Sequence, residues 1–299
     1  MRQRGAGDTY GRLLARLMSK YIPGHPTFVA QNMPGAGGIQ AANYTYTIAP
    51  QDGTVMVASR RPIAQASLTG VPGTRYDSRK FHWIGSLNNE VGVCVNYADH
   101  PVKRFEDLFE KELIVAATAN ADSDHYPQVL KNVLGAKLKI VTGYPSGASV
   151  LLAMERHEAD GRCGWSWSSV VVQKPGWTDG KLINVLVQLA VEKHPDLPHV
   201  PLVTDFARND DELKLLRFVF ASGVMGRPFM VGPRVPADRV AALRKAFDDM
   251  VKDEEVIAEF RSKKQELTPI AGNVLQKLVD ELYATPPALI ARVANAAKQ

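Results

Sequence analysis

The sequence is poor in cysteine, has no long apolar run and shows no cluster of charge of one sign. Its two cysteines, Cys94 and Cys163, are too few for a disulfide framework or a four-ligand zinc site. Both lie in apolar, strand-like stretches, which favours buried small hydrophobic side chains. No run reaches the roughly 18 apolar residues of a membrane span. The basic start of the chain is not followed by the apolar stretch of a secretory signal.

Charge gives no sign of a nucleic-acid partner. Lysine and arginine number 36 against 31 aspartates and glutamates, which gives a formal charge of +5. The basic residues are interleaved with acidic ones, and no run of five occurs. Binding to a phosphate backbone requires clustered cations, so we expect no nucleic-acid surface.

Sequence patterns of catalysis are also missing. There is no Gly-x-Ser-x-Gly elbow and no His-Glu-x-x-His motif. Histidines such as His125, His157, His194 and His199 are scattered singly and read as surface or packing residues. We therefore expect no catalytic residue, no metal site and no cofactor.

The chain does have the length for two domains, because a single core stops growing at about 250–300 residues and this chain has 299. From Thr9 to Ile22 apolar residues recur at helical spacing, with Asp8 placed to cap the helix and Pro23-Gly24 to end it. A strand (Thr27–Gln31), a glycine loop, a helix (Ile39–Ala49) and a strand (Thr54–Ala58) follow. This alternation predicts a parallel sheet covered by helices.

The rest of the chain continues in the same way. We expect strands at Glu90–Tyr97, Leu113–Ala117, Leu138–Thr142, Cys163–Trp167, Ile183–Leu189, Phe218–Ala221 and Phe229–Val231. We expect helices at Phe105–Phe109, Tyr126–Leu134, Ser149–Arg156, Ala237–Lys252, Glu254–Lys264 and Asn273–Tyr283, with a tail after Pro286-Pro287. The order indicates a first lobe, an inserted second lobe and a helical return to the first lobe.

The sharpest local feature is the loop Asn32-Met33-Pro34-Gly35-Ala36-Gly37-Gly38 before a predicted helix. Free backbone N–H groups and the positive end of the helix dipole attract an anion at such a place. The loop is not a P-loop, since no Lys-Ser or Lys-Thr follows the glycines. It is not a dinucleotide fingerprint either, because Gln40 stands at the third glycine position. A tight turn that binds nothing is the alternative.

Similar positions occur elsewhere in the chain. Gly5-Ala6-Gly7-Asp8-Thr9 opens the preceding helix, and two such loops would converge at the strand ends, where open α/β sheets bind ligands. For Arg60 and Arg61, which follow a strand end, a carboxylate contact and a solvated pair remain equally open. In the second lobe, hydroxyl and amide groups lie between strand and helix at Thr118, Asn120, Ser123, Tyr144, Ser146 and Gly147.

Several stretches together match the pattern of one known family. They are Asp8-Thr9-Tyr10, Gln31–Gly38, Ala41–Tyr44, Ala49–Gly53, Trp83–Ser86, Val235–Arg239 and Ala284–Pro287. They resemble the Bug-type receptors, which are the extracytoplasmic solute-binding proteins of tripartite tricarboxylate transporters. The likeness covers nearly the whole chain, and the glycine loop with the Ala-Pro-x-Asp-Gly turn is its most specific part.

The resemblance implies an α/β, type 2 periplasmic binding-protein fold, in which two lobes close on a ligand around hinge strands. We place lobe 1 at 1–95 plus 222–299 and the inserted lobe 2 at 96–221, with hinges near Val91–Asn96 and Phe218–Gly223. By position, the residues that hold a ligand carboxylate in lobe 1 are Gly5, Gly7, Asp8, Thr9, Asn32, Pro34, Gly35, Ala36, Gly37 and Gly38. Those that read the rest of the ligand in lobe 2 are Thr118, Asn120, Ser123, Tyr144, Ser146 and Gly147.

Two departures from the family stand out. Asp122 and Asp124 would repel a second carboxylate unless water, a cation or a cationic ligand group intervenes. The cleaved leader and central first strand of the family do not precede Gly5, and losing that strand leaves neighbouring backbone groups unpaired. We expect the chain to be a truncated or wrongly started product that lacks the first strand of lobe 1.

The resulting expectation is a monomeric, periplasmic, non-enzymatic receptor. It captures a small carboxylate by cleft closure, because a ligand that touches both lobes favours the closed state, and it delivers the ligand to membrane transporter subunits. A sensor that feeds a signalling partner is the alternative, and an enzyme on the same scaffold is a third. Ligand identity stays open.

Overall fold

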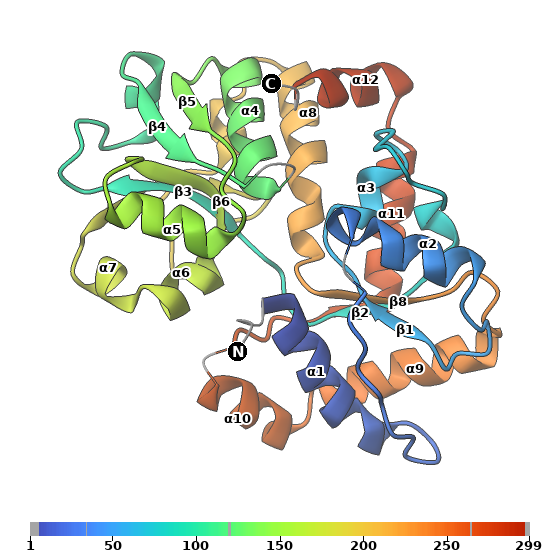
Figure 1. The fold of residues 1–299 in the computed structure, drawn as a ribbon. Coiled ribbons are helices and arrows are strands. Elements are labelled where there is room, and N and C mark those ends of the chain that lie inside the picture. Colours follow the sequence, from blue (N-terminus) through green and yellow to red (C-terminus); the bar gives the residue numbers. More distant parts are fainter. Residues whose placement is uncertain (1–5, 34, 119–120, 264, 297–299) are drawn as a thin grey trace. The chain divides into compact units, whose positions relative to one another are not determined.

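The computed structural model describes residues 6–33, 35–118, 121–263 and 265–296. The chain forms two compact units (Figure 1). Unit 1 comprises Met1–Asn89 and Val224–Pro286, and unit 2 comprises Glu90–Gly223 and Pro287–Gln299. These bounds differ from the expected 1–95 plus 222–299 and 96–221, chiefly at the C-terminus. The last helix, α12 (Pro287–Ala296), packs against α4 and α8 of unit 2.

The sheet of unit 1 is antiparallel throughout. Its strand order is β1 (Met56–Ala58), β8 (Pro228–Val231), β2 (His82–Ser86) and β9 (Ile270–Ala271). The expectation of a parallel sheet is therefore wrong for this unit. The reason is that β8 returns from far along the chain and lies between β1 and β2, so that β1 and β2 do not pair with each other.

The segment Thr27–Gln31, predicted to be a strand, forms none. Val29 in its middle is 77% exposed. Local composition favours a strand here, but a strand also needs a neighbour for its N–H and C=O groups, and β1 pairs only with β8 in the described residues. Residues 1–5, where the expected missing strand would join the chain, lie outside the described residues.

Helices cover both faces of this sheet. One core cluster joins the sheet to α1 (Ala6–Met18), α9 (Ala237–Met250) and α10 (Glu254–Ser262). The other joins it to α2 (Ile39–Thr47), α3 (Ile63–Ala66) and α11 (Gly272–Tyr283). Helix α1 begins before Asp8, so this residue lies inside the first turn. The expectation that Asp8 caps the helix is therefore wrong.

The five-stranded sheet of unit 2 has mixed directions. Its order is β5 (Leu138–Val141), β4 (Leu113–Ala116), β6 (Gly161–Ser166), β3 (Gly92–Tyr97) and β7 (Ile183–Leu189). Strand β4 is parallel to β5 and β6, whereas β3 is antiparallel to β6 and β7. The helices of this unit are α4 (Asp122–Leu134), α5 (Gly147–Glu155), α6 (Trp167–Gln173), α7 (Pro175–Asp179), α8 (Asp210–Ala221) and α12.

Two expected elements near the second boundary are corrected. Phe218–Ala221, predicted to be a strand, is the last turn of α8, so no hinge strand forms there. The side chain of Asn209 accepts a hydrogen bond from the Glu212 N–H at 2.9 Å and fixes the start of this helix. The predicted tail after Pro286 begins with helix α12.

Cys94 and Cys163 are joined by a disulfide. Both are fully buried, as expected, but the interpretation as two separate small hydrophobic side chains is wrong. They lie on the neighbouring antiparallel strands β3 and β6, which place their Cα atoms 3.9 Å apart. A count of two cysteines excludes a framework of several bridges, but it does not exclude one cross-strand link.

The disulfide predicts the result of a thiol count. We expect the unfolded, unreduced protein to take up no iodoacetamide and the reduced protein to take up two equivalents, read by intact mass. Two adducts without a reductant would show that the cysteines are free.

Candidate functional site

The glycine loop of unit 1 leads into an uncapped helix start. The φ angles of Gly35, Gly37 and Gly38 are +142°, +66° and +101°, a range that glycine adopts at little cost. Ala36 also has a positive φ, of +44°. Helix α2 follows at Ile39, and no side chain caps its start. The positive end of the helix dipole therefore lies where the sequence predicted an anion site. Pro34 lies outside the described residues.

Arg60 lies against this loop. A Cβ atom on Gly38 would lie 3.5 Å from the Cδ atom of Arg60. Arg60 is exposed, and its guanidinium makes no hydrogen bond or ion pair with any described residue. Its neighbour Arg61, by contrast, is buried and has partners of its own. The arginine pair is thus divided, and Arg60 is the exposed member beside the start of α2.

Arg12 connects the two predicted loops of unit 1. Its Nε donates to both carboxylate oxygens of Asp8, at 3.0 and 3.1 Å, and its Nη2 donates to the Asn32 side chain at 3.2 Å. Gly7 and Thr9 lie with Asp8 in the first two turns of α1, while Gly5 lies outside the described residues. The structure therefore brings the start of α1 and the start of the glycine loop together through Arg12, which sequence analysis did not single out.

In unit 2, Thr118 after β4 is joined to the start of α4. The backbone N–H of Thr118 donates to the Ser123 hydroxyl at 3.1 Å, and Ser123 is only 3% exposed. Gly164 of β6 has a φ of +69°, and a Cβ there would lie 2.5 Å from the Asp122 carbonyl oxygen. Glycine at this position lets the start of α4 contact the sheet directly. Asn120 lies outside the described residues.

The predicted residues near α5 are already engaged. Ser146 caps the helix by accepting from the Ser149 N–H at 3.2 Å. The Tyr144 hydroxyl donates to Glu158 at 3.2 Å, and burial together with this carboxylate raises the pKa of Tyr144. Gly147, at the first position of α5, lies beside a residue that sequence analysis did not single out, Arg162.

Arg162 is a cation set into an otherwise apolar strand, β6. Its Nη1 donates to the Gly147 carbonyl oxygen at 3.3 Å. Its Nε is cut off from solvent and has no hydrogen-bond partner in the described part of the chain. Burial lowers the pKa of Arg162 to about 10, and the carboxylate of Asp122 partly opposes that shift. The sequence did contain a signal, since an arginine between Gly161 and Cys163 is unusual in a buried strand.

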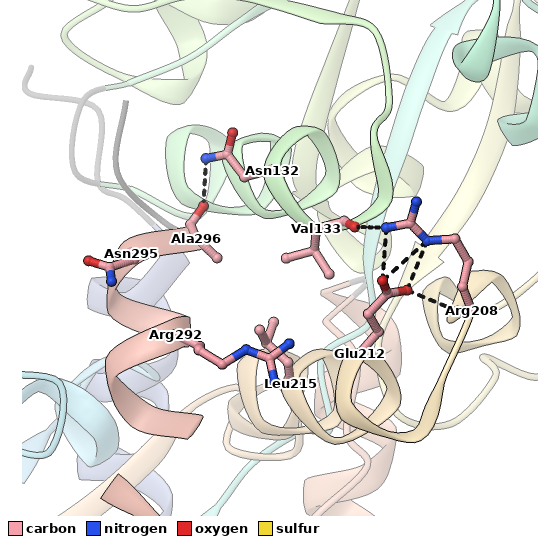
Figure 2. Close-up of a pocket in the computed structure, with 8 residues that line it drawn as sticks. All are labelled: Asn132, Val133, Arg208, Glu212, Leu215, Arg292, Asn295 and Ala296. Carbon is pink, nitrogen blue, oxygen red and sulfur yellow. Dashed lines mark hydrogen bonds and ion pairs between the residues drawn. The ribbon is translucent and has the colours of Figure 1, made fainter. Parts of the chain in front are cut away.

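A cavity of about 420 Å³ lies in another part of unit 2, between α4, α8 and α12 (Figure 2). It opens at the C-terminal end of α4, whereas the predicted ligand loop precedes the N-terminal end of that helix. Its arginines are engaged: Arg208 pairs with Glu212 at 2.8 Å and Arg292 with Asp211 at 2.9 Å. The pairing raises the pKa of Arg208 and lowers that of Glu212. The Arg292–Asp211 pair attaches α12 to α8.

The described residues contain no group of three or more His, Cys, Asp or Glu side chains placed to hold a metal ion. None of their helices has the length and apolar character of a membrane span.

Packing at Gly164 predicts that two matched glycine-to-alanine substitutions lower the free energy of unfolding by different amounts. Gly164 and Gly135 both have left-handed φ angles, of +69° and +77°, but a Cβ on Gly135 meets no atom within 4 Å. We expect Gly135→Ala to lower the free energy of unfolding by about 1–2 kcal/mol, and Gly164→Ala to lower it further because the start of α4 must move. Urea unfolding followed by circular dichroism measures both, and equal losses would contradict the packing described.

No protein-family model and no curated protein matches this sequence. Solved structures do match it. A TctC solute-binding protein from Polaromonas is 15% identical with a TM-score of 0.70, and the alignment covers 97% of this chain and 95% of that chain. Rpa4515 of R. palustris, solved with adipate, is 19% identical with a TM-score of 0.67 and coverages of 98% and 94%. MatC from Rhodopseudomonas palustris, solved with malate, is 20% identical with a TM-score of 0.65 and coverages of 99% and 96%.

These structural neighbours are solute-binding proteins of the TctC/Bug type, the family that the sequence motifs resemble. The chain therefore has the two-lobe α/β fold of periplasmic solute-binding proteins, as expected from the sequence.

Proposed function

We propose that this protein is a solute-binding receptor of the TctC/Bug type that binds small carboxylates. The observation that carries the proposal is the unpaired guanidinium of Arg60 against the uncapped start of α2. Two proteins of the same fold were solved with dicarboxylates, adipate and malate, which supports the same ligand class here.

Electrostatics favours a carboxylate at this place. The start of a helix carries the equivalent of roughly half a positive charge, and a guanidinium offers a carboxylate paired, charge-assisted hydrogen bonds. The backbone is also accessible, because a Cβ on Gly37 would meet no protein atom within 4 Å. Among the predicted residues, Asn32 and Gly35–Gly38 are proposed to contact the ligand directly, and Asp8 is proposed to orient Arg12.

The proposal extends to the biological role. We place the receptor in the periplasm, where disulfides such as Cys94–Cys163 persist. Capture by closure of lobe 2 over a ligand held by lobe 1 would present the closed form to transporter subunits, with the receptor acting as a monomer. The TctC protein of the same fold is a solute-binding protein, which supports a receptor without catalytic activity here, so we expect the ligand to be recovered chemically unchanged after incubation.

The first test is a thermal-shift and calorimetric screen of mono-, di- and tricarboxylates. A ligand that binds only the folded state raises the melting temperature by mass action. We expect Arg60→Gln to weaken the best ligand by about tenfold or more, the range of a hydrogen bond to a charged group. Arg75→Gln is the matched control, because Arg75 is an exposed arginine of the same unit. If no carboxylate binds, the proposal is wrong. If Arg60→Gln and Arg75→Gln change the ligand affinity equally, Arg60 does not contact the ligand.

A second test separates ligand contact from backbone strain. Gly37 and Gly73 have φ angles of +66° and +84°, and a Cβ on either meets no atom within 4 Å. We expect Gly37→Val and Gly73→Val to lose similar stability, since both force a branched side chain into a left-handed conformation. Only Gly37→Val should abolish the ligand-induced shift, because its side chain blocks the approach to the loop. If Gly37→Val binds the ligand with full affinity, the ligand binds elsewhere and not at this loop.

A further inference from the structure

Arg162 lies where three segments of unit 2 meet. Gly161 pairs in parallel register with Val115 of β4, which places Arg162 beside the end of that strand. Gly147, the first residue of α5, is in direct contact with Arg162, because a Cβ on Gly147 would lie 3.0 Å from the Nη2 atom of Arg162. Strand β4 continues into Thr118, the first predicted ligand residue of this unit. Arg162 is thus part of the loop cluster that the sequence assigned to the ligand.

The hydrogen-bonding capacity of this guanidinium is mostly unused. A guanidinium has five N–H donors, and the only hydrogen bond of Arg162 to a described residue is the one to the Gly147 carbonyl oxygen. The Cζ atom of Arg162 lies over the Trp165 ring, 5.1 Å from its centroid, so the ring covers one side of the group without accepting a conventional hydrogen bond. The enclosed Nε cannot turn to water for a partner. A cation held in this way is stabilised by an anion that completes its hydrogen bonds.

Other groups at this place agree with an anion. The hydroxyl of Thr118 is enclosed and has no partner in the part of the chain that the structure describes. The positive end of the nine-residue helix α5 faces the same region, since its first residue contacts Arg162. Asp122 is the opposing charge, near enough to act on Arg162. The Gly147 carbonyl oxygen takes up one N–H donor of the guanidinium, so its other donors can serve a second carboxylate.

We propose that Arg162, with Thr118 and the start of α5, binds a second anionic group of the ligand, so that the protein selects dicarboxylates over monocarboxylates. The inference rests on the proposed function, which supplies the first carboxylate site in unit 1. It also addresses the repulsion expected from Asp122, because Arg162 is a cation near enough to interact with that carboxylate. Arg162 is a specificity-determining residue in this account.

The test compares ligands that differ by one charge at constant length. Adipate and its half-amide, and succinate and its half-amide, are titrated calorimetrically into the full chain. We expect the wild type to bind the better diacid at least about tenfold more tightly than its half-amide, because a charge-assisted pair is lost. In Arg162→Gln this ratio should fall to about one, while affinity for the half-amide stays close to that of the wild type. Arg162→Lys keeps the charge without the paired donors and should give an intermediate ratio.

Controls make each outcome decisive. Arg156→Gln removes an exposed arginine from the far end of α5 and should leave the ratio unchanged. Circular dichroism and melting temperature establish that each variant is folded. If Arg162→Gln is not folded, Arg162→Lys takes its place in the comparison. A wild type that binds diacid and half-amide equally overturns the inference but leaves the receptor proposal standing. An Arg162→Gln protein that keeps the full ratio also overturns it. A wild type that binds no carboxylate overturns both.

Discussion

The half-buried guanidinium of Arg162, with its enclosed Nε, is the interaction on which the interpretation of unit 2 depends. An enclosed donor without a partner is costly, and the described residues supply the guanidinium with one carbonyl contact and an aromatic ring. In unit 1 the corresponding cation, Arg60, is exposed, so that water and salt screen its charge. In the proposed account the two arginines have different roles. Arg60 binds the carboxylate that mono- and dicarboxylates share, and Arg162 binds the second carboxylate of a diacid.

The fold supports this division by packing helix starts closely against the sheets. In unit 2, Gly164 lets the start of α4 contact β6, and Gly147 lets α5 begin over Arg162. In unit 1, Arg12 connects α1 to the glycine loop, and Arg60 lies against Gly38. The cavity between α4, α8 and α12 lies beside the attachment of α12, where Arg292 pairs with Asp211. It is separate from the residues that carry the proposed binding.

Strong periodicity made most elements predictable. The helices of unit 1 have an apolar stripe and clear ends, and α9, α10 and α11 lie within a few residues of their expected bounds. Failures came where local sequence does not decide. Phe218–Ala221 is an apolar run that suits a strand or a buried helix end equally, and Thr27–Gln31 lacks a partner strand that only tertiary structure can supply. The glycine loops were identifiable because motif and helix start coincide. Arg162 was missed because a single arginine in a strand forms no motif, and its value comes from neighbours far along the chain.

A crystal structure of the protein grown with adipate tests the central claim most directly. The account predicts one carboxylate at the start of α2 beside Arg60 and the other within hydrogen-bond distance of the Arg162 guanidinium. Adipate bound with neither carboxylate at Arg162, or bound away from the Asn32–Gly38 loop, would contradict it.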